Sequence, residues 1–393
     1  LLTAAVAAVL QSLGAAQSTG PLVGAAPLEI SSCDRNTPHI ALRVAGRQYV
    51  LIVDTGSSNT EIAAETCSSC SGVSPRFDGR ADGGNFSIDF GTGKAVISQT
   101  LADLSLGGLP LEQGSIGLIV HQSSTFGFNM FPGADDPMCY NTFAGILGLA
   151  YRGQDAGPGP NGGTTNGTTL TLLDQLVARG MPNAFALETC DAATLHCDAR
   201  RRDNTTWLPS SECGRQQMGS LLLGGYISER ILGPMRFTPI TDEVHYDVQL
   251  LGVRICGLRG CRRVDFPDSL AGATEEDCMC SSPDCAPGTV RYCSFTVIDS
   301  GSDMVYMNTA ANAMALIRTM DEVGMVRFPS NTSSKTREAF WFNGSAARGA
   351  QAAPQAVFEL ELAPSAGGEP STNVSMSLAA TFQKTPDGLV QVG

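Results

Sequence analysis

The chain has 393 residues, of which 42% are hydrophobic and 16% charged, a composition typical of a globular protein that is long enough for two lobes. Its formal net charge of -13 argues against nucleic-acid binding and suits an acidic or extracellular compartment. The chain has no Gly-x-Ser-x-Gly elbow, His-Glu-x-x-His motif or complete Walker loop. Serine hydrolases of the elbow type, zinc peptidases of that motif and P-loop enzymes are therefore excluded.

The first ten residues, Leu1 to Leu10, are mostly apolar and are followed by small residues through Ala15 and Ala16. This pattern predicts a partial signal peptide over residues 1–16 that lacks its charged start. The run is too short to span a membrane. A buried strand or an unordered start is the alternative, and the missing initiator Met favours a fragment of a longer precursor.

Thirteen cysteines are many for a cytosolic protein and favour an oxidising compartment, although an odd number leaves at least one without an intrachain partner. The group formed by Cys278, Cys280, Cys285 and Cys293 lacks the spacing of paired Cys-x-x-Cys ligands, so we expect disulfides and no metal site. The chain also has six Asn-x-Ser/Thr sequons, which begin at Asn85, Asn166, Asn204, Asn331, Asn343 and Asn373. These features predict passage through the secretory pathway.

Short alternating strands with Gly-rich turns predict a mostly β protein. Residues 39–44 and 48–53 are expected to form an antiparallel pair, and residues 95–106 a series of strands. The predicted helices span residues 169–179 and 309–320. Two insertions rich in turn-forming or charged residues, at residues 153–167 and 191–215, are expected to be surface loops. Residues 258–285 are expected to be a further insertion, which lengthens the sequence between the two Asp motifs.

One four-residue sequence occurs twice, as Asp54-Thr55-Gly56-Ser57 and as Asp299-Ser300-Gly301-Ser302, each time after an apolar run. A β-branched strand holds the acidic residue at its end, and the Gly permits the tight turn behind it. A single copy would be an ordinary turn. Two copies predict a centre with two carboxylates, in which like charges at short range share one proton.

With these turns in place, the chain resembles the pepsin-like aspartic proteases, and the beta-secretase branch in particular. The resemblance covers residues 38 to 393 with insertions. It implies a mostly β, bilobal fold with pseudo-twofold lobes: an N-terminal lobe over residues 28–215 and a C-terminal lobe over residues 216–393. Besides the Asp turns, it rests on residues 87–93 (a flap hairpin), 143–151 (the apolar-apolar-Gly segment), 219–225, 236–240 and 340–342.

The resemblance implies an aspartic endopeptidase in which Asp54 and Asp299 activate water to hydrolyse a peptide bond. It assigns supporting roles to the residues around them, a flap role to three residues, and a disulfide to two cysteines. The supporting residues are Thr55, Gly56, Ser57, Ser300, Gly301 and Ser302; the flap residues are Phe90, Gly91 and Thr92; the disulfide joins Cys67 and Cys70. The implied partner is a peptide or protein substrate, with no nucleic acid and no cofactor, and the protein is expected to be a monomer.

Two residues depart from the family pattern. Phe90 stands where most active relatives carry Tyr, which keeps the ring and loses a hydrogen-bond donor. Asp303 stands where a hydroxyl residue is usual, and an extra carboxylate would raise the proton affinity of the pair. The alternatives are therefore a pepsin-fold binding or inhibitor protein without turnover, or an enzyme active at higher pH.

The second half has no convincing counterpart of Ile146-Leu147-Gly148, because residues 389–393 match that pattern poorly. We therefore expect a C-terminal lobe that is incomplete in this chain. A membrane anchor beyond residue 393, with the catalytic domain in the lumen, is one expectation for its location. Secretion and an acidic endolysosomal or vacuolar lumen are the others.

Overall fold

The protein is described by a computed structural model. It describes residues 24–31, 34–70, 73, 75–80, 84–90, 93–123, 143–151, 171–189, 215–231, 235–242, 245–257, 259–267, 296–301, 310–323, 341–343, 357–364, 371–377, 382–384 and 389–392. The predicted signal peptide over residues 1–16 lies outside these residues, as do Gly91, Thr92, Ser302 and Asp303.

The chain divides into two compact units. The first comprises Leu1–Pro234, Glu243–Tyr246 and Asp299–Asp303. The second comprises Met235–Asp242, Asp247–Ile298 and Met304–Gly393. Both Asp turns therefore belong to the first unit, although one of them comes from the second half of the sequence. The predicted lobe boundary at residues 215/216 stays a prediction.

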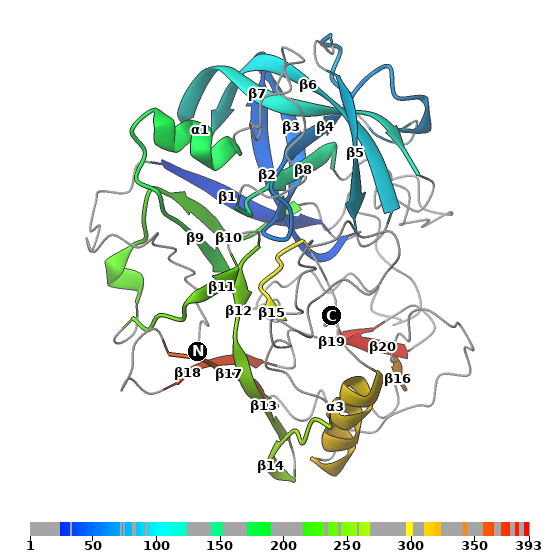
Figure 1. Ribbon diagram of the computed structural model, residues 1–393, viewed down its shortest axis with the longest axis vertical. Coiled ribbons are helices and arrows are strands. Elements are labelled where there is room, and N and C mark those ends of the chain that lie inside the picture. The colour runs from blue at the N-terminus through cyan, green and yellow to red at the C-terminus, as the bar shows by residue number, and fades with distance from the viewer. Residues whose placement is uncertain are drawn as a thin grey trace, which may run out of the picture. The chain divides into compact units, whose positions relative to one another are not determined.

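The first unit is built on a ten-stranded sheet with the order β5-β6-β7-β4-β8-β3-β2-β1-β10-β9 (Figure 1). Its pairings are antiparallel except for β3 with β8 and β4 with β7. Its strands are β1 (Gly24–Ser31), β2 (Asp34–Val44), β3 (Arg47–Asp54), β4 (Thr60–Ala63), β5 (Asn85–Phe90), β6 (Gly93–Leu106), β7 (Leu109–Gln122), β8 (Gly145–Gly148), β9 (Phe185–Thr189) and β10 (Arg215–Leu223). The prediction of a mostly β protein is confirmed.

The predicted antiparallel pair is formed by β2 and β3, in register from His39 opposite Ile52 to Val44 opposite Arg47. The strands are joined by Ala45 and Gly46, whose φ angles of 47° and 81° are the left-handed values that a two-residue hairpin turn requires. On β3, alternate residues are buried up to its end. The strand therefore holds Asp54 at the edge of a well-packed core.

Strand β8 lies between β3 and β4, where Gly145 is opposite Leu51 on one side and Ile62 on the other. A Cβ atom on Gly145 would come within 1.8 Å of the Glu61 carbonyl oxygen. Only glycine allows the two backbones to approach this closely. The apolar segment predicted to lie in the core is thus a central strand of the sheet.

The predicted helix near residue 170 is α1 (Leu172–Ala178), shorter than expected at both ends. It begins with a capping box, in which the Asp174 amide donates to Thr171 Oγ1 over 3.0 Å and the Thr171 amide donates to Asp174 Oδ2 over 3.3 Å. The expected strand series is one continuous strand, β6. Two short 3₁₀ helices, η1 (Ser68–Cys70) and η4 (Ser228–Arg230), complete the described part of this unit.

The described residues of the second unit form three small sheets, ordered β11-β12-β15, β14-β13-β17-β18 and β16-β20-β19. The predicted second helix is α3 (Ala310–Glu322), which packs Leu316 and Met320 into a core with Ile255 and Phe358. The strands are β11 (Ile240–Asp242), β12 (Asp247–Val248), β13 (Leu250–Gly257), β14 (Gly260–Arg263), β15 (Thr296–Val297), β16 (Trp341–Asn343), β17 (Val357–Leu362), β18 (Thr372–Ser377), β19 (Phe382–Lys384) and β20 (Leu389–Val392).

The start of the insertion expected over residues 258–285 contains regular structure. Residues 260–263 form β14, which pairs with β13 in a hairpin joined by a Cys256–Cys261 disulfide. The sequence did not indicate this strand, because a short strand gains its stability from its partner, here β13, and from the disulfide rather than from its own residues. None of the helices in the described part of the chain combines the length and apolar character that crossing a membrane requires.

Candidate active site

Asp54 is the last residue of β3 and is 9% exposed. Its carboxylate accepts a hydrogen bond at each oxygen. The Gly56 amide donates to Oδ1 over 2.8 Å, and the Ser57 hydroxyl donates to Oδ2 over 2.6 Å. The turn behind the strand thus fixes the orientation of the carboxylate, as the motif predicts.

Asp299 follows β15 and belongs to a turn of the same design. The Gly301 amide donates to Asp299 Oδ1 over 2.8 Å, the same contact that Gly56 makes to Asp54. The position equivalent to Ser57 is Ser302, which lies outside the described residues. The repeated sequence therefore gives a repeated local geometry.

The two turns brace each other through a reciprocal pair of hydrogen bonds between residues 245 positions apart. The Thr55 amide donates to Ser300 Oγ over 3.1 Å, and the Ser300 amide donates to Thr55 Oγ1 over 2.8 Å. The Ser300 hydroxyl in turn donates to the Val53 carbonyl over 2.7 Å. Each backbone donor is satisfied by the opposite side chain, so the distance between the turns is fixed.

Glycine at the third position of each motif makes room for the opposite carboxyl group. A Cβ atom on Gly56 would lie 2.7 Å from Asp299 Cγ, and one on Gly301 would lie 2.4 Å from Asp54 Oδ1. Each contact is shorter than real Cβ atoms make. The sequence suggested glycine here because it permits a tight turn. The structure adds a steric reason, because each carboxyl group faces the opposite turn and leaves no room for a Cβ atom.

The surroundings of Asp299 raise the pKa of its carboxyl group. Burial of the carboxyl group, then the negative charge of Asp54 and a hydrogen bond with it, raise the pKa of Asp299 from 3.8 to about 7. The Gly301 amide and His245 oppose this rise in pKa. Asp299 is exposed as a residue, but its carboxyl group faces Gly56 in the Asp54 turn, and this side of the carboxyl group accounts for the desolvation. The pair therefore holds one proton in acidic solution.

A raised pKa predicts how stability depends on pH. A carboxylic acid whose pKa is higher in the folded state stabilises the fold while it is protonated, and this contribution is lost as the pH rises through the folded value. We expect Asp299 to lower the free energy of unfolding between about pH 4 and about 7. Urea denaturation at several pH values should show this loss in the wild-type protein and a smaller loss in Asp299→Asn.

The exposed Asp78 offers a control, because Asp78→Asn removes one carboxylate at a surface position. This variant should keep the wild-type dependence of stability on pH. An unchanged dependence in Asp299→Asn would contradict the raised pKa of Asp299.

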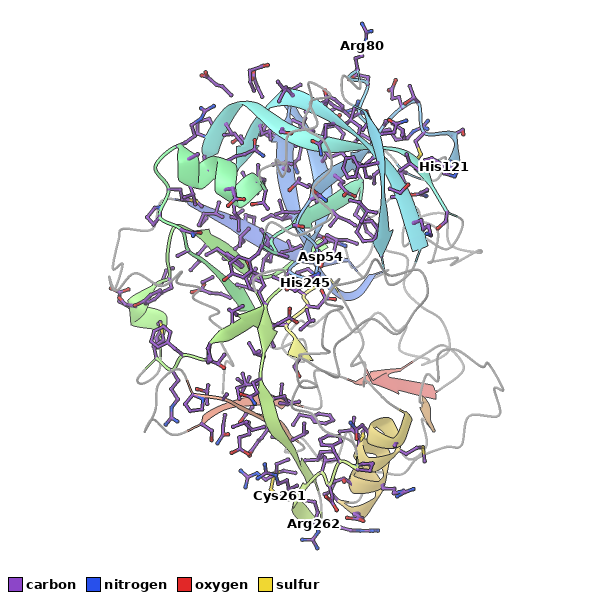
Figure 2. The ribbon with its side chains drawn as sticks, in the orientation of Figure 1. Asp54, Arg80, His121, His245, Cys261 and Arg262 are labelled. Atoms are coloured by element: carbon purple, nitrogen blue, oxygen red, sulfur yellow. A yellow bond between two sulfur atoms is a disulfide. The ribbon has the colours of Figure 1, made fainter. Side chains whose placement is uncertain are left out.

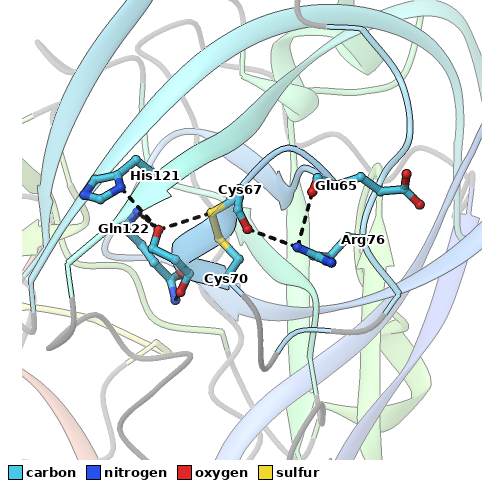
Figure 3. Close-up of a disulfide and its surroundings, with 7 residues drawn as sticks. Glu65, Cys67, Cys70, Arg76, His121 and Gln122 are labelled. Carbon is cyan, nitrogen blue, oxygen red and sulfur yellow. Dashed lines mark hydrogen bonds between the residues drawn. A yellow bond between two sulfur atoms is a disulfide. The ribbon is translucent and has the colours of Figure 1, made fainter.

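The expected disulfide between Cys67 and Cys70 is present, and both residues are fully buried (Figure 3). Its loop is tied to β7 because the Gln122 amide donates to Ser69 Oγ over 2.8 Å, and Ser69 Oγ also contacts His121 Nδ1 at 3.3 Å. On the other side, Arg76 donates to the Cys67 carbonyl over 3.0 Å and to the Glu65 carbonyl over 3.3 Å. These contacts fix the chain that leaves β4.

The predicted flap corresponds to the hairpin of β5 and β6, in which Phe90 pairs with Gly93 across the turn. Phe90 is partly buried and is the last described residue before that turn. Gly91 and Thr92 lie outside the described residues, so their flap role stays a prediction. No cluster of three or more His, Cys, Asp or Glu side chains that could hold a metal ion occurs in the part of the chain that the structure describes.

Tyr246 was not predicted from the sequence as part of the site. It is buried and donates a hydrogen bond from its hydroxyl to the Leu149 carbonyl. The Leu149 amide donates to the Asp54 carbonyl over 2.8 Å, so Tyr246 is linked to the site through one residue. Leu149 lies in the apolar segment that the sequence identified. The contact between Tyr246 and Leu149 could not be predicted, because the sequence of residues 243–246 contains no pattern that indicates a contact with that segment.

Comparison with known proteins agrees with this geometry. Residues 39–187 match the family model described as eukaryotic aspartyl protease. This match includes the Asp54 turn but ends before Asp299. The second half of the site therefore rests on the repeated motif and on the structure.

Three relatives illustrate the similarity. Gastricsin from Cavia porcellus is 24% identical over 238 residues, which are 57% of this chain and 50% of that protein. Cathepsin E from Aquarana catesbeiana is 26% identical over 226 residues, 56% of this chain and 47% of that protein. Rhizopuspepsin-1 from Rhizopus niveus is 28% identical over 149 residues, which are 36% of this chain and 33% of that protein.

The chain thus spans half or less of the length of these relatives. None of the three carries a name of the beta-secretase branch. Two braced Asp turns and a mostly β fold agree with these similarities to pepsin-like aspartic proteases.

Proposed function

We propose that the protein is an aspartic endopeptidase that hydrolyses peptide bonds with Asp54 and Asp299 acting as one unit. The observation that carries the proposal is the reciprocal bracing of the two Asp turns, which brings their carboxyl groups face to face. A rigid pair of carboxyl groups sharing one proton is the arrangement that can supply a base and an acid in the same step.

In the first step the ionised carboxylate takes a proton from water, and the water oxygen forms a bond to the scissile carbonyl carbon. The protonated carboxyl group gives its proton to the carbonyl oxygen, so a neutral tetrahedral diol forms without a covalent enzyme adduct. In the second step one hydroxyl of the diol gives its proton to the carboxylate that is now ionised. The amide nitrogen accepts the proton held by the other carboxyl group. The carbon–nitrogen bond then breaks, which yields a carboxylic acid and an amine and restores the shared proton.

The supporting residues keep this pair in place. Ser57 and Gly56 orient the Asp54 carboxylate, Gly301 orients Asp299, and Thr55 and Ser300 fix the separation of the turns. Closing of the β5–β6 hairpin over a bound peptide would exclude water and strengthen the electrostatic interactions beneath it. In this proposal Phe90, Gly91 and Thr92 contact the substrate.

Disulfides at Cys67–Cys70 and Cys256–Cys261 support an extracellular or lumenal location for this activity. A monomer with a peptide or protein substrate remains our proposal for its assembly and partners. Assignment to the beta-secretase branch, and a membrane anchor of that kind, rest on the sequence resemblance alone.

The proposal is tested by incubating the protein with an unbiased peptide library between about pH 3 and 7, the range in which a carboxyl pair titrates. We expect a bell-shaped dependence of cleavage on pH, because the pair must hold one proton and not two or none. Mass spectrometry of the products would identify the side chains preferred around the cleaved bond. Absence of cleavage by folded protein at every pH would contradict the proposal.

The second candidate function is a pepsin-fold binding protein without turnover. It is favoured by Phe90, which lacks the hydroxyl of the Tyr that most active relatives carry at this position. Phe90→Tyr adds a hydroxyl on a hairpin whose backbone pairing is already formed. If the protein is a protease, we expect kcat/KM to rise about fivefold, the rate equivalent of one net hydrogen bond of about 1 kcal/mol. Steady-state cleavage of a peptide chosen from the library measures this change.

Phe86→Tyr is the matched control, because Phe86 lies on the same strand and is also partly buried. Its kcat/KM should stay at the wild-type value. If neither the wild-type protein nor Phe90→Tyr cleaves any peptide, the binding protein becomes the better interpretation.

A further inference from the structure

The segment that ends at Tyr246 belongs to the first unit, although the chain on either side of it belongs to the second. Tyr246 is 5% exposed, and its ring packs against Tyr151 and Phe185 at centroid distances of 5.1 and 5.8 Å. Its hydroxyl donates to the Leu149 carbonyl. Burial and removal from water raise the pKa of Tyr246 above its usual value, so the hydroxyl remains a donor throughout the pH range of the protein.

Leu149 belongs to a short segment that runs along the Asp54 turn. The Leu149 amide donates to the Asp54 carbonyl over 2.8 Å, and the Ala150 amide donates to the Ser57 carbonyl over 2.9 Å. The backbone behind Asp54 is thus held from one side by Leu149 and Ala150. Tyr246 satisfies the carbonyl of the first of these residues, which places it one hydrogen bond away from the Asp54 backbone.

His245 precedes Tyr246 directly, so the anchored tyrosine limits where the imidazole can lie. Figure 2 shows His245 and Asp54 in the same part of the first unit, with His121 well away from them. His245 acts electrostatically on Asp299, and Asp54 is the other titratable group that acts on this carboxyl. Tyr151 and Asp174 are the titratable groups that act on Tyr246.

We propose that His245 and Tyr246 form a positioning pair for the two-carboxylate site, in which Tyr246 anchors the segment beside Asp54 and thereby holds the His245 imidazole near Asp299. A histidine becomes positively charged in acidic solution, within the range in which the shared proton of the pair matters. The positive charge stabilises the ionised form of Asp299 and so limits the pH up to which the pair keeps its proton. The inference rests on the proposed function, because it sets the pH range of that same site.

The test follows the carboxyl groups directly, independently of turnover. Carboxyl-labelled aspartate is introduced into the whole protein, and the ¹³C shift of Asp299, assigned by its loss in Asp299→Asn, is recorded against pH. In His245→Gln we expect the pKa of Asp299 to move upward by roughly half a pH unit or more, because an opposite charge has been removed. His245→Lys, which keeps a positive charge, should hold that pKa at or below the wild-type value.

Tyr246→Phe removes only the hydroxyl and tests the anchor. On its own it should move the pKa of Asp299 in the same direction as His245→Gln, because the imidazole is released. When Tyr246→Phe is added to His245→Gln, we expect no further change in the pKa of Asp299. A further upward movement in the double variant would overturn the anchoring role of Tyr246.

His121→Gln is the matched control, because His121 contacts Ser69 at the disulfide loop and lies away from the site. It should leave the titration of Asp299 unchanged. An unchanged titration in folded His245→Gln would overturn the inference, whether or not the protein cleaves peptides. A shifted titration without any cleavage would support the inference while contradicting the proposed protease activity, so the two failures are distinguishable.

Discussion

Asp54→Asn and Asp299→Asn are each expected to lower kcat/KM for peptide cleavage by about 10³-fold or more, the scale of a positioned acid or base. Asparagine keeps the shape of the side chain and can still accept from the Gly56 or Gly301 amide. It cannot share a proton with the remaining carboxyl group. The loss should therefore appear in catalysis, with folding preserved as judged by circular dichroism.

The two losses should not add. In the proposed reaction the carboxyl groups act as one unit, so removal of either should stop the same proton transfers. The double variant should therefore be about as inactive as each single variant. Asp78→Asn, at an exposed position, should retain full activity. Retention of more than about a tenth of the wild-type kcat/KM in either single Asn variant would contradict a shared role, since such a loss is below the usual range for a general acid or base.

Gly145→Ala is expected to cause the largest loss of stability among single methyl additions in the first unit. The added Cβ would meet the Glu61 carbonyl oxygen at 1.8 Å and the Glu61 carbonyl carbon at 2.8 Å. These are backbone atoms of the neighbouring strand β4, so no side chain can move aside. We expect the free energy of unfolding to fall by at least about 3 kcal/mol, at the upper end of what overpacking costs.

Urea denaturation followed by circular dichroism measures this change. Gly252→Ala on β13 is the control, since the three atoms nearest to its Cβ would all belong to the Arg263 side chain, whose exposed guanidinium can move. Its effect should remain within about 0.5 kcal/mol. A loss below about 1 kcal/mol in Gly145→Ala would contradict the close approach of β8 and β4, since overpacking of a rigid site costs more than this.

The local elements were predictable because their causes are local. Alternating apolar residues and an Ala-Gly turn specify the β2–β3 hairpin, and a Thr-x-x-Asp capping box starts α1. The two Asp turns were also predictable, since a β-branched strand followed by Asp-x-Gly specifies the same turn wherever it occurs. The identical amide contacts of Gly56 and Gly301 follow from that repetition.

Strand β1 was not predicted, because most of its stability comes from a distant partner. It pairs with β10 from Gly24 opposite Leu223 to Ser31 opposite Arg215, and its own sequence contains Pro27, which disfavours a strand assignment. No local pattern indicates a pairing across so many residues. The β13–β14 hairpin was missed for a related reason, since its disulfide becomes apparent only when Cys256 and Cys261 are brought opposite each other.

The sequence by itself therefore predicted which residues would carry the proposed chemistry and determined how each Asp turn is built, because strand ends and tight turns depend on a few adjacent residues. Only the tertiary structure decided that the turns brace each other through Thr55 and Ser300, that each Gly makes room for the opposite carboxyl group, and that Tyr246 supports the Asp54 backbone. These contacts join residues about 100 to 250 positions apart. The packing of the whole sheet selects them, and no short stretch of sequence contains that information.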